Sequence, residues 1–225
     1  MRPCVKSVVD ATKEDVVATF GVPASKVHVV YNAVTHPNRS RDPQPGLVLY
    51  AGRLTTNKGV HVLLKAFQIA RETAPDLRLT LLGGTEDQVA AYQKMAQDSG
   101  IESAVTFEGS QPKNKVLDAF AKASFVVVPS LSEGFGFVVI EAFSVGTPVI
   151  GSNTGGIKEI VRDGVDGQLV EPGDHNALAA TLIALHNDAD LLLKYGVNAH
   201  QRFLDTFELR LVVDQLNTYL QSQLS

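Results

Sequence analysis

Six short apolar runs, separated by segments with helical periodicity, constrain the fold of this chain more than any other feature. Most of the runs are continuously apolar instead of alternating, which is typical of parallel strands buried on both faces of a sheet. The runs are LVLYAG (47–52), LRLTLLG (77–83), VTFEG (105–109), FVVVP (125–129), PVIG (148–151) and GQLV (167–170). The segments expected to be helical are 60–70, 86–99, 112–123, 136–146 and 155–162. This alternation predicts an α/β fold with a doubly wound, Rossmann-like parallel sheet.

The segments on either side of this region have a different pattern. Residues 5–34 are predicted to form a strand–helix–strand unit, and the polar, proline-containing segment 35–46 is predicted to be a linker or surface loop. After residue 173 the pattern is helical, with an apolar stripe of Leu209, Val212, Leu216 and Leu220. The helices are expected over 174–187, 190–203 and about 207–222. We therefore expect four parts, namely 1–34, a linker over 35–46, a sheet domain over 47–203 and a C-terminal helix over 204–225.

Charge and cysteine content exclude several classes of protein. The 20 lysines and arginines stand against 24 aspartates and glutamates, without the basic excess of a nucleic-acid-binding protein. The single cysteine, Cys4, cannot form an internal disulfide, and the six scattered histidines lack the spacing of metal ligands. No apolar stretch reaches the ~20 residues of a transmembrane helix, and the N-terminal segment has no signal-peptide core. We expect a cytoplasmic protein without a metal site.

The segment after the first apolar run is a candidate phosphate-binding loop. Ligands of open α/β sheets bind beyond the carboxyl ends of the strands, and here GRLTTNKG places Arg53 and Lys58 around a polar loop. The segment fails the P-loop pattern twice, because Asn57 replaces the second glycine and Gly59 stands where a serine or threonine would hold magnesium. Two cations at a strand end still suit a diphosphate. The alternative is a solvated loop with ordinary surface charges.

Two glutamates flank a glycine-containing turn after the fourth run, in SEGFGFVVIE (132–141). Gly134 and Gly136 are expected to open a helix whose first N–H groups favour an anion. The segment also resembles a dinucleotide fingerprint, but Val139 occupies the third glycine position. If both glutamates were helical, Glu133 and Glu141 would lie ~12 Å apart, beyond the about 5–9.5 Å of a glycosidase pair.

A spacing of this kind suits the two ends of a long ligand with an anionic centre. A nucleotide sugar has that layout, with sugar hydroxyls, a diphosphate and then ribose hydroxyls. The alternative is structural: Glu133 is favoured by the dipole of the helix, and Glu141 pairs with a lysine. The segments GGTED and SQPKNK, after the second and third runs, would let a ligand approach the backbone closely or would be plain turns.

Several motifs together resemble one known family. PSLSEGFGFVVIEAFSVGTPVIGSNTGGIKEIV (129–161) is very similar to the donor-binding motif of the family 4 retaining glycosyltransferases, which have the GT-B fold and two glutamates separated by seven residues. GRLTTNKG matches the Gly-Arg…Lys-Gly element of that family, and VVYNAV is similar to the strand before its interdomain linker. The final helical region resembles the tail that crosses back to the partner domain. The resemblance covers roughly residues 5–222 and implies the C-terminal, donor-binding domain of this fold.

The resemblance also implies a role for each candidate residue. Arg53 and Lys58 would neutralise the diphosphate, Glu133 would bind hydroxyls of the donor sugar, and Glu141 would bind the ribose hydroxyls. The backbone around four consecutive residues would hold the distal phosphate and the sugar, and two residues after the third run would lie beside the base. These residues are Phe135, Gly136, Phe137 and Val138, and then Ser110 and Gln111.

The reaction that the resemblance implies retains the anomeric configuration of the donor and needs no metal or other cofactor. The mechanism expected is front-face substitution, in which the leaving phosphate helps to deprotonate the acceptor. Glu133 would then orient and stabilise the sugar beside Arg53 and Lys58, and would not act as a nucleophile.

One departure from the family is large. Its members carry a whole N-terminal Rossmann-like domain that binds the acceptor, whereas about 34 residues precede the linker here. We therefore expect the donor half of a glycosyltransferase, as a truncated chain, a split gene product or a stand-alone binder. The expected partners are a UDP-, GDP- or ADP-linked sugar, and an N-terminal domain or a second copy bound through the 207–222 helix. A peripheral association with a membrane would leave no mark in this sequence.

Two other functions stay open. The chain could be a nucleotide-sugar-binding or assembly module without catalysis of its own. It could also be a sugar-nucleotide epimerase of related fold, although an epimerase needs an acid–base set on both sides of its cleft.

Overall fold

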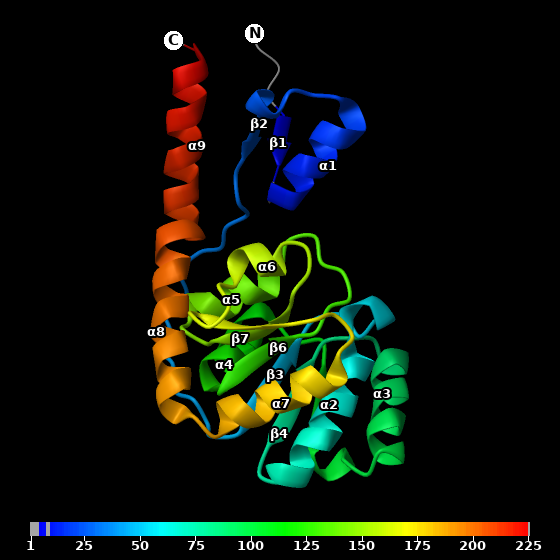
Figure 1. The fold of residues 1–225 in the computed structure, drawn as a ribbon. Coiled ribbons are helices and arrows are strands. Elements are labelled where there is room, and N and C mark those ends of the chain that lie inside the picture. Colours follow the sequence, from blue (N-terminus) through cyan, green and yellow to red (C-terminus); the bar gives the residue numbers. More distant parts are fainter. Residues whose placement is uncertain (1–4, 8–9, 225) are drawn as a thin grey trace.

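A computed structural model describes residues 5–7 and 10–224, and its centre is a six-stranded parallel sheet (Figure 1). The strands are β3 (Leu47–Ala51), β4 (Arg78–Leu82), β5 (Val105–Gly109), β6 (Phe125–Val128), β7 (Val149–Ser152) and β8 (Gly167–Val170). Their order across the sheet is β5-β4-β3-β6-β7-β8, and all neighbours are parallel. Each predicted apolar run contains one of these strands. The predicted doubly wound α/β fold is therefore confirmed.

Both faces of this sheet are apolar, because successive apolar side chains of a strand point to opposite faces. Helices therefore cover both faces. Val48 and Tyr50 belong to one buried cluster, whereas Leu49 and Ala51 of the same strand belong to another. The first cluster includes residues of α2 (Val60–Thr73), α3 (Glu86–Asp98) and α7 (His175–His186). The second includes residues of α4 (Lys113–Lys122), α5 (Phe137–Ser144), α6 (Ile157–Ile160) and α8 (Ala189–Thr206). Short 3-10 turns cover Ala24–Lys26, Thr56–Lys58 and Glu102–Ala104.

A small unit precedes the sheet domain. It consists of β1 (Val5–Ser7), α1 (Asp10–Phe20) and β2 (Val27–Val29), and the two strands form a separate parallel pair. Figure 1 shows this unit beside the long C-terminal helix α9 (Leu209–Leu224), and the rings of His28 and Tyr219 stack with centroids 4.0 Å apart. The strand predicted up to residue 34 ends at Val29.

The chain passes between the small unit and the sheet domain twice, at neighbouring places. The N–H of Val34 donates to the Phe207 carbonyl at 3.1 Å, and the N–H of Leu209 donates to the Val34 carbonyl at 3.1 Å. These two bonds form an isolated parallel bridge between Val34 and Glu208. The two crossings are therefore fastened to each other.

The linker over 35–46 is bound along the sheet domain. Arg39 forms an ion pair with Asp118 of α4 at 2.6 Å, and this hydrogen bond lowers the pKa of the Asp118 carboxyl. An Arg41 nitrogen donates to the Ser124 carbonyl at 2.8 Å, and the Ser124 hydroxyl donates to the Gln44 carbonyl at 2.7 Å. This polar segment is thus a surface loop held by specific contacts. At the C-terminal boundary of the sheet domain, α8 continues to Thr206, beyond the predicted residue 203.

The predicted apolar stripe of the last helix divides in two. Val212 is buried and Leu216 is partly buried, and both line a pocket with residues 28–31 of the small unit. Leu209 and Leu220 are exposed. Part of this stripe therefore packs within the chain instead of awaiting a partner. Within residues 5–7 and 10–224, none of the helices combines the length and apolar character that crossing a membrane requires.

Replacing Leu63 by alanine tests the packing of α2 on the sheet. Leu63 is completely buried in the first cluster, so removing its side chain should leave a cavity and lower the free energy of unfolding by about 2–5 kcal/mol. Lys65→Ala changes an exposed residue of the same helix and should alter stability by at most about 0.5 kcal/mol. Urea denaturation measures both, and equal losses in the two variants would contradict this account of the core.

Candidate functional site

The order of the strands marks one point of the sheet as the natural place for a ligand. The connections run outward in opposite directions from β3 and β6, which are neighbours. In open parallel sheets, ligands bind in the crevice beyond the carboxyl ends of two such strands. The loops that begin there are residues 52–59 after β3 and 129–136 after β6. These loops contain Arg53, Lys58 and Glu133.

Hydrogen bonds and an ion pair join the two loops. The N–H of Leu131 donates to the Asn57 carbonyl at 2.9 Å, and the Asn57 side chain donates to the Ser132 carbonyl at 3.1 Å. The Lys58 ammonium lies 2.6 Å from a carboxylate oxygen of Glu133, and each of these side chains is 18% exposed. The structure thus brings together two residues that belong to separate sequence motifs.

A glycine allows this close approach. Gly59 has a φ of 68°, and a Cβ at this position would lie 1.9 Å from the Pro129 carbonyl oxygen. Any larger residue would push α2 and the preceding Lys58 away from the loop after β6. Gly83 has the same function beside it, because its Cβ would lie 2.0 Å from the Gly52 carbonyl oxygen.

Tyr50 fixes the backbone of Arg53. Its hydroxyl donates to the Arg53 carbonyl at 2.6 Å. Burial, and then the nearby Tyr92 and Glu133, raise the pKa of the Tyr50 hydroxyl well above its ordinary value, so the hydroxyl remains a donor at neutral pH. The Arg53 side chain is exposed, and in the described part of the chain it forms no ion pair. Its charge is therefore available to a ligand.

The loop that carries Glu133 rests on a pair of glycines after β7. The N–H of Gly156 donates to the Glu133 carbonyl at 3.3 Å. A Cβ on Gly155 would lie 1.7 Å from that same carbonyl oxygen, and a Cβ on Gly156 would lie 2.3 Å from the Phe135 carbonyl oxygen. These glycines were not among the predicted site residues, although the doubled glycine in NTGG directly after a strand could have indicated them.

Helix α5 begins at Phe137, with Gly136 as its N-cap at a φ of 103° and no side-chain cap. The first N–H groups of a helix have no partner within it and carry a partial positive charge. Phe135 is buried against Tyr31 and Phe207, so only its backbone can face a ligand. Val138 is partly buried and Phe137 is 49% exposed. Because Glu133 lies before the helix, the ~12 Å estimated for two helical residues does not describe the two glutamates.

Glu141 lies on α5 with its side chain 16% exposed and forms an ion pair with Lys113 at the start of α4. The pairing of Glu141 with a lysine, one of the interpretations left open by the sequence, is thus present. Lys113 was not among the predicted site residues. Its signal was a lysine two positions after Gln111, where a helix begins at the carboxyl edge of the sheet.

Ser110 and Gln111 follow β5, the outer strand on this side of the sheet. The Ser110 hydroxyl donates to the Gly84 carbonyl at 3.1 Å, and the Gln111 amide donates to the Glu108 carbonyl at 2.7 Å. They lie on the same edge as Arg53 but two strands farther from the switch point, and Lys113 connects their segment to Glu141. Among the described residues, no three or more His, Cys, Asp and Glu side chains gather where they could hold a metal ion.

Comparison with known proteins gives a consistent result. The sequence model of the family "Glycosyl transferases group 1" matches residues 34–202. The chain is 34% identical over 158 residues to the D-inositol 3-phosphate glycosyltransferase of Corynebacterium glutamicum, covering 68% of this chain and 38% of that protein. It is 32% identical over 205 residues to the glycogen synthase of Mycobacterium tuberculosis, covering 88% of this chain and 49% of that protein. The chain thus spans less than half the length of these relatives.

Solved structures share the fold. HepE of Anabaena in complex with UDP superposes with a TM-score of 0.88 at 24% identity, over 98% of this chain and 64% of that one. Sucrose-phosphate synthase from Thermosynechococcus elongatus superposes with a TM-score of 0.86 at 25% identity, over 98% of this chain and 58% of that one.

A comparison of two glycine variants tests the support of the Glu133 loop. Gly155→Ala places a Cβ 1.7 Å from the Glu133 carbonyl oxygen at a φ of +46°, so we expect the free energy of unfolding to fall by about 1–3 kcal/mol. Gly134→Ala, in the loop itself, meets nothing within 4 Å and should change it by at most about 0.5–1 kcal/mol. Chemical denaturation measures both variants. A Gly155→Ala protein as stable as the Gly134→Ala protein would show that the loop does not depend on this contact.

Proposed function

Because the chain belongs to the family of group 1 glycosyl transferases, we propose that the carboxyl edge of its sheet binds a nucleotide-diphosphate sugar as the donor of a glycosyl transfer reaction. The observation that carries this proposal is the 2.6 Å contact between Lys58 and Glu133 across the point where the strand order reverses. It unites a cation suited to phosphate and a carboxylate suited to sugar hydroxyls in the crevice where such folds hold nucleotides. The solved complexes of HepE with UDP and UDP-glucose support the choice of ligand.

In the proposed complex, the diphosphate lies between the loop after β3 and the start of α5. Arg53 and Lys58 supply positive charge from one side, and the free N–H groups at Phe137 and Val138 supply it from the other. Glu133 accepts hydrogen bonds from the donor sugar. Lys58 forms an ion pair with Glu133 in this structure, so the diphosphate competes with this carboxylate for the ammonium.

The nucleoside lies farther along the same edge. Glu141 accepts hydrogen bonds from the ribose hydroxyls, and Lys113, which forms an ion pair with it in this structure, orients the carboxylate. The Ser110–Gln111 segment lies beside the base. The support for this arrangement is that α4 carries Lys113 to Glu141 directly after that segment.

The reaction proposed is transfer with retention of configuration, by front-face substitution and without a metal. The bond between the anomeric carbon and the phosphate oxygen breaks, and the acceptor oxygen bonds to that carbon on the same face. The acceptor proton passes to the leaving phosphate. Arg53, Lys58 and the N-terminus of α5 stabilise the charge that develops on this phosphate, and such stabilisation is commonly the largest contribution to catalysis.

The chain spans less than half the length of its curated relatives. That this chain catalyses the transfer by itself is therefore a separate part of the proposal, with its own test. The second candidate is a binding module without activity of its own. Release of glucose or UDP from UDP-glucose, followed over hours with and without EDTA, separates the two. Turnover that persists in EDTA supports the metal-free enzyme, tight donor binding without turnover supports the module, and turnover lost in EDTA contradicts the metal-free reaction.

Substituting each glutamate tests the division of labour. Glu141→Gln should lower the affinity for UDP and the affinity for UDP-glucose by a similar factor of about ten, because a hydrogen bond to a charged group is lost. Glu133→Gln should lower the affinity for UDP-glucose. Its affinity for UDP should be unchanged or higher, because Lys58 is then free to bind the diphosphate. Glu102→Gln, before β5 at the opposite edge, is the matched control. Calorimetric titration measures all of these affinities. Equal losses of UDP affinity in the first two variants would refute the assignment, as would absence of binding of UDP, GDP and ADP at millimolar concentration.

Replacing Arg53 tests the position of the diphosphate. Arg53→Gln should lower the affinity for UDP by about tenfold and the affinity for UMP by much less, since a charge-assisted contact to the second phosphate is lost. Its UDP binding should also depend less steeply on salt. Arg78→Gln removes the same charge at the amino end of β4 and should leave both affinities unchanged. Identical losses for UMP and UDP would place Arg53 away from the second phosphate.

A further inference from the structure

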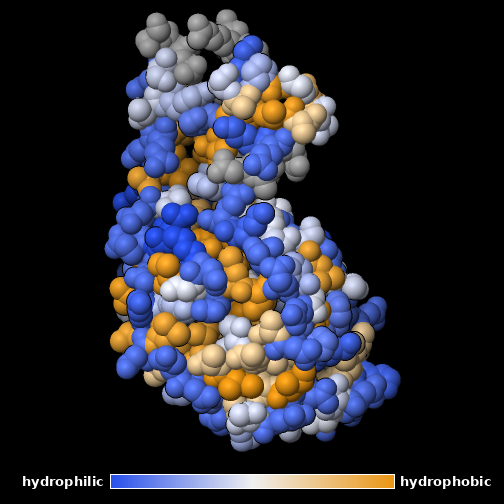
Figure 2. Space-filling view, in the orientation of Figure 1, coloured by the Kyte–Doolittle hydropathy of each residue, from blue (hydrophilic) through white to orange (hydrophobic). Residues whose placement is uncertain are grey.

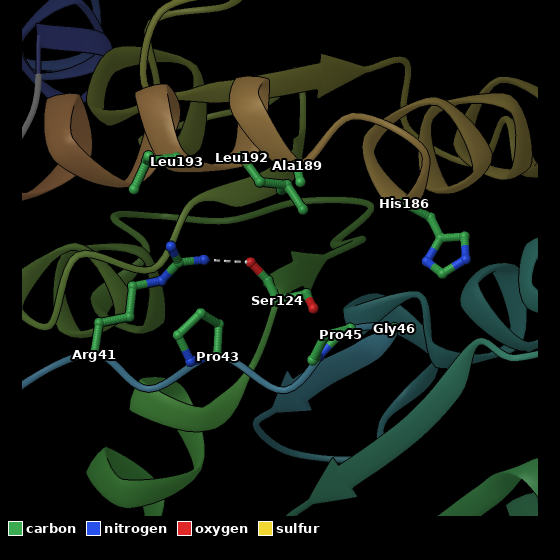
Figure 3. A pocket seen from close by; sticks show the side chains of 9 residues that line it. All are labelled: Arg41, Pro43, Pro45, Gly46, Ser124, His186, Ala189, Leu192 and Leu193. Atoms are coloured by element: carbon green, nitrogen blue, oxygen red, sulfur yellow. Dashed lines mark hydrogen bonds between the residues drawn. The ribbon is translucent and has the colours of Figure 1, made fainter.

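A pocket of about 200 Å³ opens at the opposite edge of the sheet from the proposed donor site (Figure 3). Its walls come from the linker, from Ser124 just before β6, and from the end of α7 and start of α8. The residues are Arg41, Pro43, Pro45, Gly46, Ser124, His186, Ala189, Leu192 and Leu193. Gly46 and Ser124 precede strands β3 and β6. The pocket therefore lies at the amino ends of the two strands whose carboxyl ends carry Arg53 and Glu133.

Arg41 brings an unpaired positive charge to this pocket. One of its terminal nitrogens donates to the Ser124 carbonyl at 2.8 Å, a contact drawn in Figure 3, but its buried Nε has no hydrogen-bond partner. Throughout residues 5–7 and 10–224, no carboxylate lies within ion-pair distance of it. Burial lowers the pKa of this guanidinium, but arginine stays charged at neutral pH. A partly buried charge of this kind is stabilised when an anion pairs with it.

The remaining walls are mostly apolar. Pro43 and Pro45 face Ala189, Leu192 and Leu193 across the pocket in Figure 3, and Leu193 is 62% exposed although it is a leucine. An apolar cavity of about 150 Å³ holds benzene, so a space of about 200 Å³ holds a ring with one small substituent. The pocket thus combines one charge with room for one apolar group.

We propose that this pocket binds a small organic monoanion, a carboxylate carried on an aromatic or branched apolar body, with Arg41 pairing with the carboxylate. A single negative charge matches the site because the other basic side chain of the lining, His186, already lies 3.0 Å from Asp76. A phosphate dianion fits less well, because it carries two negative charges and no apolar group. The pocket offers it mostly apolar walls and one cation, Arg41, that has no carboxylate partner among the described residues.

Such a ligand would connect the linker to α8. Arg41 belongs to the linker, whereas Leu192 and Leu193 belong to α8, so one bound molecule would contact both. This site shares no residue with the proposed donor site, and it stands whether or not the chain binds nucleotide sugars.

The test uses benzoate and the full chain. Benzoate should bind saturably with a dissociation constant on the order of 1 mM, as expected for a ligand of this size, and should perturb backbone amide NMR signals of residues 41–46 and 189–193. Benzyl alcohol has the same ring without the charge, and inorganic phosphate has charge without the ring. Each should bind at least about tenfold more weakly than benzoate.

Arg41→Gln should lower the affinity for benzoate at least about tenfold. Arg39→Gln should leave this affinity unchanged, although it removes the same charge two positions away, at the ion pair with Asp118. Leu193→Asp alters an exposed residue, so the fold should be retained, and its carboxylate should compete with benzoate for Arg41. Loss of binding in Arg41→Gln and Leu193→Asp but not in Arg39→Gln supports the site. Binding of benzyl alcohol or phosphate as tight as that of benzoate overturns the proposal, and so does unchanged benzoate binding in either pocket variant.

Discussion

Burial of both faces of the parallel sheet is the constraint on which the rest of this structure depends. Alternate residues of one strand, Val48 and Tyr50 against Leu49 and Ala51, enter two separate apolar clusters. Where helices cover both faces, as they do over β3 and β6, polar side chains that act on a ligand lie at the ends of the strands. The candidate donor site occupies the carboxyl edge, and the pocket around Arg41 (Figure 3) occupies the amino edge. Figure 2 shows apolar patches surrounded by hydrophilic residues on the visible surface of the sheet domain.

The carboxyl edge owes its shape to backbone packed on backbone. Gly59 lies against Pro129, Gly83 against Gly52, and Gly155 against Glu133. A Cβ added to any of these three glycines would lie 2.0 Å or less from the carbonyl oxygen of its neighbour. These contacts hold the loops more firmly than long side chains could, because backbone atoms have fewer ways to move. The charged groups of the site therefore stand on a rigid base, even though they are carried by loops. Rigid placement of charge before the ligand arrives is what makes electrostatic stabilisation effective.

The sequence predicted this fold well because its signal is local. Each continuous apolar run became a strand, since length and composition alone distinguish a buried parallel strand from its surroundings. Arg53, Lys58 and Glu133 could be selected because each lies in a loop that follows a strand, and Glu141 because of its spacing from Glu133. Their mutual arrangement could not be derived from the residues, because Lys58 and Glu133 are 75 positions apart and only the order of strands makes them neighbours. Lys113 and the Gly155–Gly156 pair were missed for the same reason, since their partners are distant in the sequence.

The bridge between Val34 and Glu208 has a mechanical consequence. A single connecting strand would act as a swivel, about which the small unit and the sheet domain could turn in any direction. Two connections side by side, joined through the Val34 amide and carbonyl, would oppose such rotation, because twisting one crossing about the other would stretch both hydrogen bonds. Bending about the line through the two crossings would leave both bonds intact, and it would move the small unit and α9 together relative to the loops that follow β3 and β6.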